Sequence, residues 1–294
     1  MVPPYVLWPS VAGVVFALAA LGLKRAIESG LGPWRLTTVN SWFFALIFAP
    51  LWFVPVGQET RWEWKVPVVI GTLSLIGNLL MMQALGRGDV SVAGPLMGTK
   101  VLYVAALTPV VLGEAVPLRW WVGAALSAVG VALLGGDGSH RGGHRVLTIC
   151  CSLGSAMVFA VADVLVQRWV SAGAFPRVMP LAMLWAAVLS LVLVPFFRAP
   201  LHALSTRTWG YLAWGGGALG AQAMLILYTL SHHGHATAVN IAYSTRGIWS
   251  VVLVGVLGRW LATPGEQARM DRRTLCRRLA GASVVLVAVI LVLV

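Results

Sequence analysis

The chain has 294 residues; 59% of them are hydrophobic, only 10% are charged, and the formal net charge is +12. Soluble domains carry about 25% charged residues, so this composition excludes an ordinary soluble protein and indicates an integral membrane protein. The basic residues lie mostly in short segments between apolar runs, where they face anionic lipid. No basic domain remains that would bind nucleic acid.

Ten apolar runs come close to the roughly 20 residues that a transmembrane helix requires. In chain order they lie near residues 6–23, 36–56, 66–85, 91–112, 119–135, 146–167, 178–197, 209–230, 237–258 and 277–294. The connections between them are short and leave no room for a soluble domain. We therefore expect an all-α integral membrane fold with ten transmembrane helices.

The chain also contains an internal repeat, visible first in runs one and six. "VFALAALGLKRAIESG" (15–30) aligns with "VFAVADVLVQRWVSAG" (158–173), with six identical positions of sixteen, among them Phe16/Phe159. "GDVSVAGPLMGTKVLY" (88–103), in run four, aligns with "GHATAVNIAYSTRGIW" (234–249), in run nine. This predicts two five-helix repeats, residues 1–138 and 139–294. An odd number of spans inverts the second repeat, and inverted repeats with a site at their interface are a transporter architecture.

Only three ionisable side chains lie well inside the predicted spans: Lys100, Asp163 and Arg246. A charge near the bilayer centre costs about 2.5–3.5 kcal/mol on insertion scales and usually faces a cavity or a partner. Lys100 and Arg246 occupy equivalent places in runs four and nine, roughly 15 Å from the helix ends. We expect both cations to face one central space.

Two cations in one cavity repel each other unless a negative group lies between them. Asp163 is one candidate for that group, and the anionic part of a substrate is another. In the purely structural alternative, Asp163 neutralises one cation and the three residues only hold helices together. These alternatives stay open at the level of sequence.

Further candidates surround the two cations. Tyr103 and Trp249 follow Lys100 and Arg246 by one turn and can stack on a ligand or on the cation. Tyr243 precedes Arg246 by one turn. The remaining candidates are the two threonines that directly precede the cations and two amides at corresponding points of runs three and eight: Thr99, Thr245, Asn78 and Gln222.

Catalytic and cofactor chemistry have no counterpart in the sequence. The three histidines of "SHHGHAT" (231–237) do not have a spacing that fixes a metal geometry. No phosphate-binding loop of the G-x-x-x-x-G-K-[ST] kind and no nucleophile–base pair stands out. We expect no enzyme activity, no metal and no cofactor, and transport that runs on a gradient or by exchange.

The segment from Met81 to Gly135 resembles the drug/metabolite transporter superfamily in its ten-helix EamA-like form. It carries Ala84-Leu85 at the end of helix three, a proline-bearing helix four that ends in Gly113-Glu114, and a glycine-rich helix five. In the second half Gly258-Arg259 stands where Gly-Glu often recurs. The resemblance implies alternating access around a cavity lined mainly by helices 1, 3, 4, 6, 8 and 9. The plastid sugar-phosphate translocators are similar in placing basic residues on helices four and nine.

These observations together predict a secondary transporter for a small organic anion or zwitterion held by Lys100 and Arg246. We expect it in the lipid bilayer of a bacterial cytoplasmic (inner) membrane, as a monomer or homodimer. Alternatives are an exporter of amino acids or amphipathic drugs and, in another class, a lipid-headgroup flippase or a non-transporting membrane partner protein. Lys and Arg favour the odd-numbered connections, which places both termini outside, whereas the family places them inside; the orientation stays open.

Overall fold

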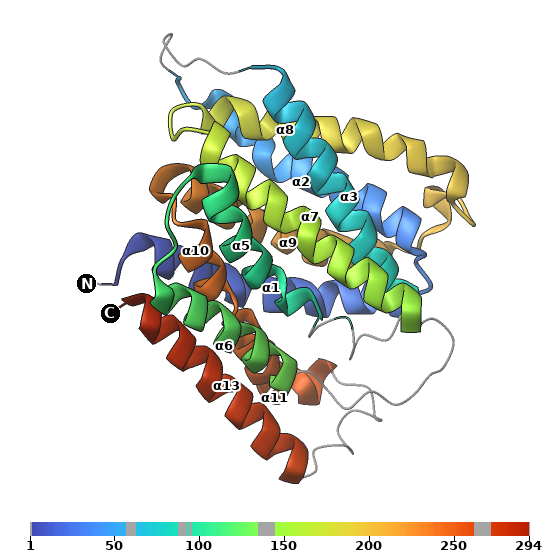
Figure 1. Ribbon diagram of the computed structural model, residues 1–294. Coiled ribbons are helices and arrows are strands. Elements are labelled where there is room, and N and C mark those ends of the chain that lie inside the picture. Colours follow the sequence, from blue (N-terminus) through green and yellow to red (C-terminus); the bar gives the residue numbers. More distant parts are fainter. Residues whose placement is uncertain are drawn as a thin grey trace.

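A computed structural model describes residues 2–56, 63–87, 93, 96–134, 145–261 and 272–293. These residues are helical and contain no β-strand (Figure 1). Parts of several sequence features lie outside them: the start of the fourth run, the repeat positions 88–92, and most of the connection between runs nine and ten. The predicted all-α membrane fold is confirmed, with six described helices long and apolar enough to span a membrane.

The first half of the chain contains helices for each of its predicted spans. Proline is favoured in the first turn of a helix, where its missing N–H is not needed, and it stands there in α1 and α2. A 3₁₀ turn, η1, extends α2. The bounds are α1 Pro4–Glu28, α2 Pro33–Phe48, η1 Ala49–Phe53, α3 Lys65–Arg87, α5 Lys100–Leu112 and α6 Leu118–Leu134.

In the second half the predicted ninth span is broken into two helices. α10 ends at Tyr243 and α11 begins at Arg246, so the break falls directly before this cation. The bounds are α7 Arg145–Trp169, α8 Phe175–Leu189, η2 Ser190–Phe196, η3 Leu201–Ala203, α9 Thr206–His233, α10 Ala236–Tyr243, α11 Arg246–Leu261 and α13 Arg272–Leu293.

The end of α5 shows why a Gly-Glu pair stops this helix. Gly113 has a φ of +72°, a left-handed conformation that suits glycine. Its N–H donates to the carbonyl of Pro109 at 3.1 Å and so satisfies one of the last carbonyls of the helix. The chain then turns towards α6 with Glu114 at the helix end.

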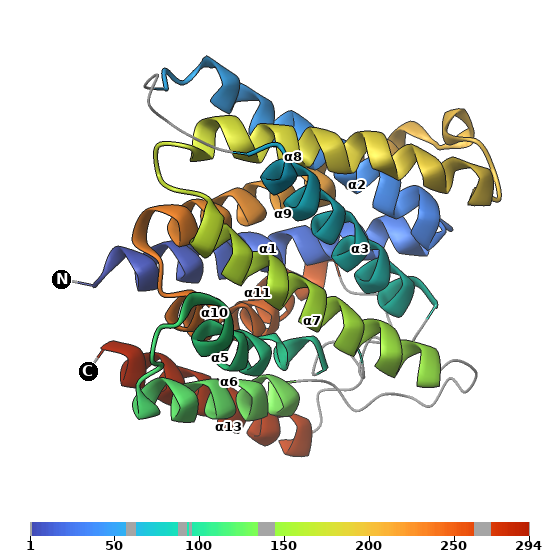
Figure 2. The ribbon, with the colours of Figure 1, turned by 45° about the horizontal axis from the view of Figure 1, so that its top comes forward.

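The long helices pack across the two halves of the chain. α1 lies against α9, α3 against α7, α2 against α8 and α9, and α6 against α13. Figures 1 and 2 show α6 and α13 side by side, and both chain termini at one end of the bundle. The largest buried apolar cluster is formed mainly by α1, α2, α3, α7, α8 and α9.

Glycines allow two of these helix pairs to approach backbone to backbone. A Cβ on Gly22 of α1 would lie 2.7 Å from the backbone nitrogen of Gly215 of α9, and a Cβ on Gly281 of α13 would lie 2.8 Å from the carbonyl oxygen of Gly130 of α6. Such contacts take the place of hydrophobic burial in lipid, where apolar side chains gain little by meeting each other.

Candidate functional site

Lys100 and Arg246 each begin a helix immediately after a tight turn made by the preceding threonine. The N–H of Thr99 donates to the carbonyl of Leu96 at 3.2 Å, and its hydroxyl donates to the same oxygen at 2.7 Å. The N–H and hydroxyl of Thr245 donate in the same way to Ala242, at 3.2 and 2.8 Å. Each threonine thus closes an i to i−3 turn, tighter than an α-helical turn.

The hydrogen bonds that leave the two turns also match. The N–H groups of Leu102 and Tyr103 donate to the carbonyl of Thr99 at 2.9 and 3.3 Å. The N–H groups of Ile248 and Trp249 donate to the carbonyl of Thr245 at 2.9 and 3.1 Å. Four hydrogen bonds therefore recur at the same spacing around both cations. Both cationic side chains line the same cavity.

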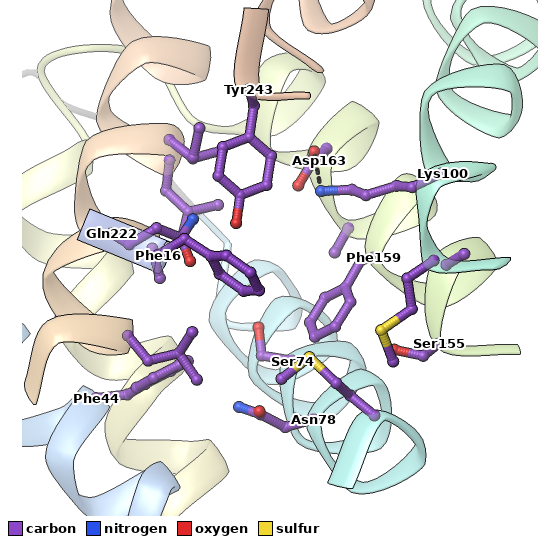
Figure 3. A pocket seen from close by; sticks show the side chains of 18 of the residues that line it. Phe16, Phe44, Ser74, Asn78, Lys100, Ser155, Phe159, Asp163, Gln222 and Tyr243 are labelled. Carbon is purple, nitrogen blue, oxygen red and sulfur yellow. Dashed lines mark ion pairs between the residues drawn. The ribbon is translucent and has the colours of Figure 1, made fainter. Parts of the chain in front are cut away.

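Lys100 is paired with the buried carboxylate of Asp163. Its Nζ lies 2.7 Å from Oδ2 of Asp163, and the two side chains are 14% and 6% exposed (Figure 3). Asn240 of α10 donates its Nδ2 to the same carboxylate oxygen at 2.8 Å. Asp163 thus joins α5, α7 and α10 through a charged and a neutral hydrogen bond. The sequence left two candidates for the negative group beside the cations, and Asp163 is the one in contact with Lys100.

Arg246 lies among aromatic rings instead. Its guanidinium carbon is 4.9 Å from the ring centroid of Phe16 and 4.6 Å from that of Tyr243. Among the described residues, no carboxylate forms an ion pair with Arg246. A guanidinium has five N–H donors, and those that do not bond to the Tyr243 hydroxyl are available for a planar anion.

A cavity of about 110 Å³ brings these groups together at the centre of the bundle. Its polar and charged lining residues are Ser74, Asn78, Lys100, Ser155, Asp163, Gln222, Tyr243 and Arg246. Figure 3 shows Lys100, Asp163 and Tyr243 on one side of this space and Ser74 and Asn78 on the other, with the rings of Phe16 and Phe159 between them. The cavity therefore has a charged side and a neutral amide and hydroxyl side.

The comparisons with known proteins agree with this architecture. The model of the EamA-like transporter family matches residues 3–136. The match covers somewhat less than half of the chain, and over these residues the chain is similar to the EamA-like transporter family. The resemblance seen in the sequence is thus confirmed, and the family indicates an integral membrane transporter of small molecules. Its members are transporters, which is compatible with the expected lack of enzyme activity.

A solved structure shares the fold of this protein over nearly the whole chain. This structure, described only as "Crystal structure of protein", aligns with 96% of this chain and 98% of its own, with a TM-score of 0.69 and 19% identity. At that identity the likeness shows the fold alone. A search of curated proteins gives no match.

Six of the predicted site residues line the central cavity, and four do not. The lining residues are Lys100, Arg246, Asp163, Tyr243, Asn78 and Gln222. The hydroxyls of Thr99 and Thr245 are bonded within their own turns. Tyr103 packs at the edge of the apolar core, and Trp249 is 38% exposed on the outer surface. Three residues of helix rotate a side chain by about 300°, so an i+3 neighbour lies about 60° round from the cation.

Tyr103 and Trp249 were predicted to supply the aromatic ring beside each cation. In the structure two phenylalanines supply these rings instead. The Nζ of Lys100 lies 5.8 Å from the ring centroid of Phe159, as Arg246 lies over Phe16. Each ring therefore lies near the cation from the other half of the chain. Phe16 and Phe159 are an identical pair in the aligned repeat, and this identity is the sequence signal that picks them out.

Proposed function

We propose that this EamA-like protein is a secondary transporter whose substrate, a small organic anion or zwitterion, binds between Arg246 and Lys100 and moves by alternating access. The observation that carries the proposal is Arg246: a guanidinium that faces a central cavity, with aromatic neighbours and no carboxylate partner among the described residues. A carboxylate, phosphate or sulfonate group fits the two-pronged donor geometry of arginine.

The same proposal includes two inverted five-helix repeats, residues 1–138 and 139–294. The helix contacts support it because they come in reciprocal pairs. The contact of α1 with α9 corresponds to that of α7 with α3, and the contact of α1 with α10 and α11 corresponds to that of α7 with α5. The cavity lies where these pairs meet, which is where inverted-repeat transporters bind substrate.

Polar contacts at the end of the bundle that holds both termini support an alternating-access mechanism. The hydroxyls of Thr108 and Thr237 are 3.2 Å apart, and Gln167 accepts a hydrogen bond from the N–H of Ala236 at 2.7 Å. Gln167 also donates to Glu114 at 3.2 Å. These bonds join α5, α7 and α10 between the cavity and that end. We propose that they separate when the cavity opens there.

Counterflow in proteoliposomes tests the function. Vesicles are loaded with a candidate anion such as lactate, and uptake of the labelled compound is followed. Arg246→Ala should abolish counterflow while the protein stays monodisperse. Arg207→Ala is the matched control, because Arg207 also lies over a ring, that of Tyr211 at 5.8 Å, but outside the cavity. Normal counterflow in Arg246→Ala and Lys100→Ala would refute the site.

A second candidate function is the export of amino acids or amphipathic drugs. Much of the lining is apolar and polarisable, with Phe16, Phe44, Phe159, Met81 and Met183 around the central space. Such a lining suits the apolar body of an organic cation or amphiphile. A screen of anions, amino acids and cationic dyes separates the two: uptake of dyes that survives Arg246→Ala favours the second function.

We further propose the bacterial cytoplasmic membrane as the location. Because both termini lie at one end of the bundle (Figure 1), a single C-terminal tag reports the orientation of the whole molecule. Accessibility of that tag in intact cells places the termini outside; accessibility only after permeabilisation places them inside.

A further inference from the structure

The charges of the central cavity do not cancel. Lys100 and Arg246 carry one positive charge each, and Asp163 carries one negative charge, so the formal sum is +1. In water, lysine, arginine and tyrosine keep their protons at neutral pH. Asp163 is the only carboxylate among the described residues that line the cavity.

Among the described residues, the helices packed around Asp163 contribute no second carboxylate and no histidine to the cavity lining. α5 contributes Lys100, α11 contributes Arg246, and α10 contributes Asn240 and Tyr243. α3 and α9 add only neutral polar groups to the lining: Ser74, Asn78 and Gln222. Proton exchange at this site therefore concerns Asp163.

A substrate with one negative charge neutralises the cavity and leaves the ion pair between Lys100 and Asp163 intact. An anionic group on Arg246 brings the sum to zero while Lys100 and Asp163 remain paired at 2.7 Å. A second negative charge has to displace Asp163 from Lys100, and the sum becomes −1. An uncompensated charge in a poorly solvated cavity is strongly disfavoured.

Protonation of Asp163 removes that obstacle. The proton comes from bulk water and converts the carboxylate to a carboxyl group, which breaks the ion pair with Lys100. The ammonium group of Lys100 then binds the second anionic oxygen of the substrate, and the sum is again zero. Asn240 can continue to donate to the neutral carboxyl group, because that group keeps an acceptor oxygen.

We infer that this site takes a monoanion without a proton and a dianion together with one proton, which Asp163 carries. The inference rests on the proposed function, since it assumes that Arg246 and Lys100 hold the substrate. It adds the charge class of the substrate and a proton stoichiometry that depends on that class. The carboxylate of Asp163 is the counter-ion of Lys100 until the second anionic group of a doubly charged substrate takes its place.

Calorimetric titration of the purified full-length protein in detergent tests this with two probes that do not titrate near neutrality, ethanesulfonate and 1,2-ethanedisulfonate. Titrations in buffers of different ionisation enthalpy give the proton uptake. We expect about one proton per disulfonate and none per monosulfonate. Over the pH range in which disulfonate binding takes up a proton, disulfonate affinity should fall about tenfold per unit rise in pH, while monosulfonate affinity stays constant.

Asp163→Asn imitates the protonated state and should make disulfonate binding independent of pH. Asp163→Glu keeps the carboxylate and should retain the pH dependence, and a monodisperse profile in size-exclusion chromatography confirms that each variant is folded. An unchanged pH slope in Asp163→Asn, equal proton uptake for both probes, or no disulfonate binding at any pH would overturn the inference. If binding of both probes survives Arg246→Ala, or neither probe binds, the proposed function fails with it.

Discussion

Replacement of Lys100 by methionine should destabilise the protein more than the same replacement of Arg246. Lys100→Met leaves Asp163, only 6% exposed, with Asn240 as its one remaining donor among the described residues. Removing one partner of a buried ion pair typically costs about 3–5 kcal/mol of unfolding free energy. Arg246→Met removes contacts with two rings, worth about 0.5–2 kcal/mol each, and strands no carboxylate.

The double variant Lys100→Met/Asp163→Asn supplies the control. It replaces the ion pair by neutral groups of similar volume, a change that is often neutral or even stabilising. We expect it to recover most of the stability that Lys100→Met loses, although it should not bind a dianion. The assay is reversible unfolding in mixed micelles, followed by circular dichroism. The reasoning is refuted if Lys100→Met costs less than about 1 kcal/mol, or if the double variant is less stable than Lys100→Met.

Three further predictions concern packing, the end of α5 and the site. Gly215→Ala should cost about 1–3 kcal/mol of unfolding free energy, because its Cβ would lie 2.6 Å from the backbone nitrogen of Leu23. The control is Gly217→Ala, which should be neutral or slightly stabilising, because a Cβ there has nothing within 4 Å. Gly113→Ala forces a left-handed residue and should cost roughly 1–2 kcal/mol in the same unfolding assay. Phe16→Leu should raise KM for an anion several-fold in counterflow with folding intact, since it removes one ring face from Arg246; an unchanged KM would show that the ring does not position the guanidinium.

The all-α membrane fold and the order of its helices were predictable from the sequence. The length and composition of each apolar run reflect the thickness of the bilayer that a helix has to span. The charged centre was predictable too, because buried charges are rare enough in apolar runs for three of them to stand out. Lys100, Asp163 and Arg246 do line one cavity.

The breaks before Lys100 and Arg246 were not predictable. Neither Thr99 nor Ser244-Thr245 is a strong helix breaker by propensity. The tight turns depend on a threonine hydroxyl that bonds to its own i−3 carbonyl, and a regular helix also allows such local bonds. The aromatic partners of the two cations were missed for a different reason. The i+3 spacing identifies neighbours on the same helix only, whereas Phe16 and Phe159 lie on other helices than the cations that they contact.

The position of each cation at a threonine turn has a mechanical consequence. When a transmembrane helix tilts about a fixed point, its ends move furthest and the residues at that point move least. Lys100 and Arg246 each lie at the junction of two helical segments, so the arm on either side can swing while the charge stays near the axis of rotation. Under the alternating-access mechanism that we propose, we expect the two charges to stay in contact with the substrate in both the outward-open and the inward-open state, so that no second set of charges is required.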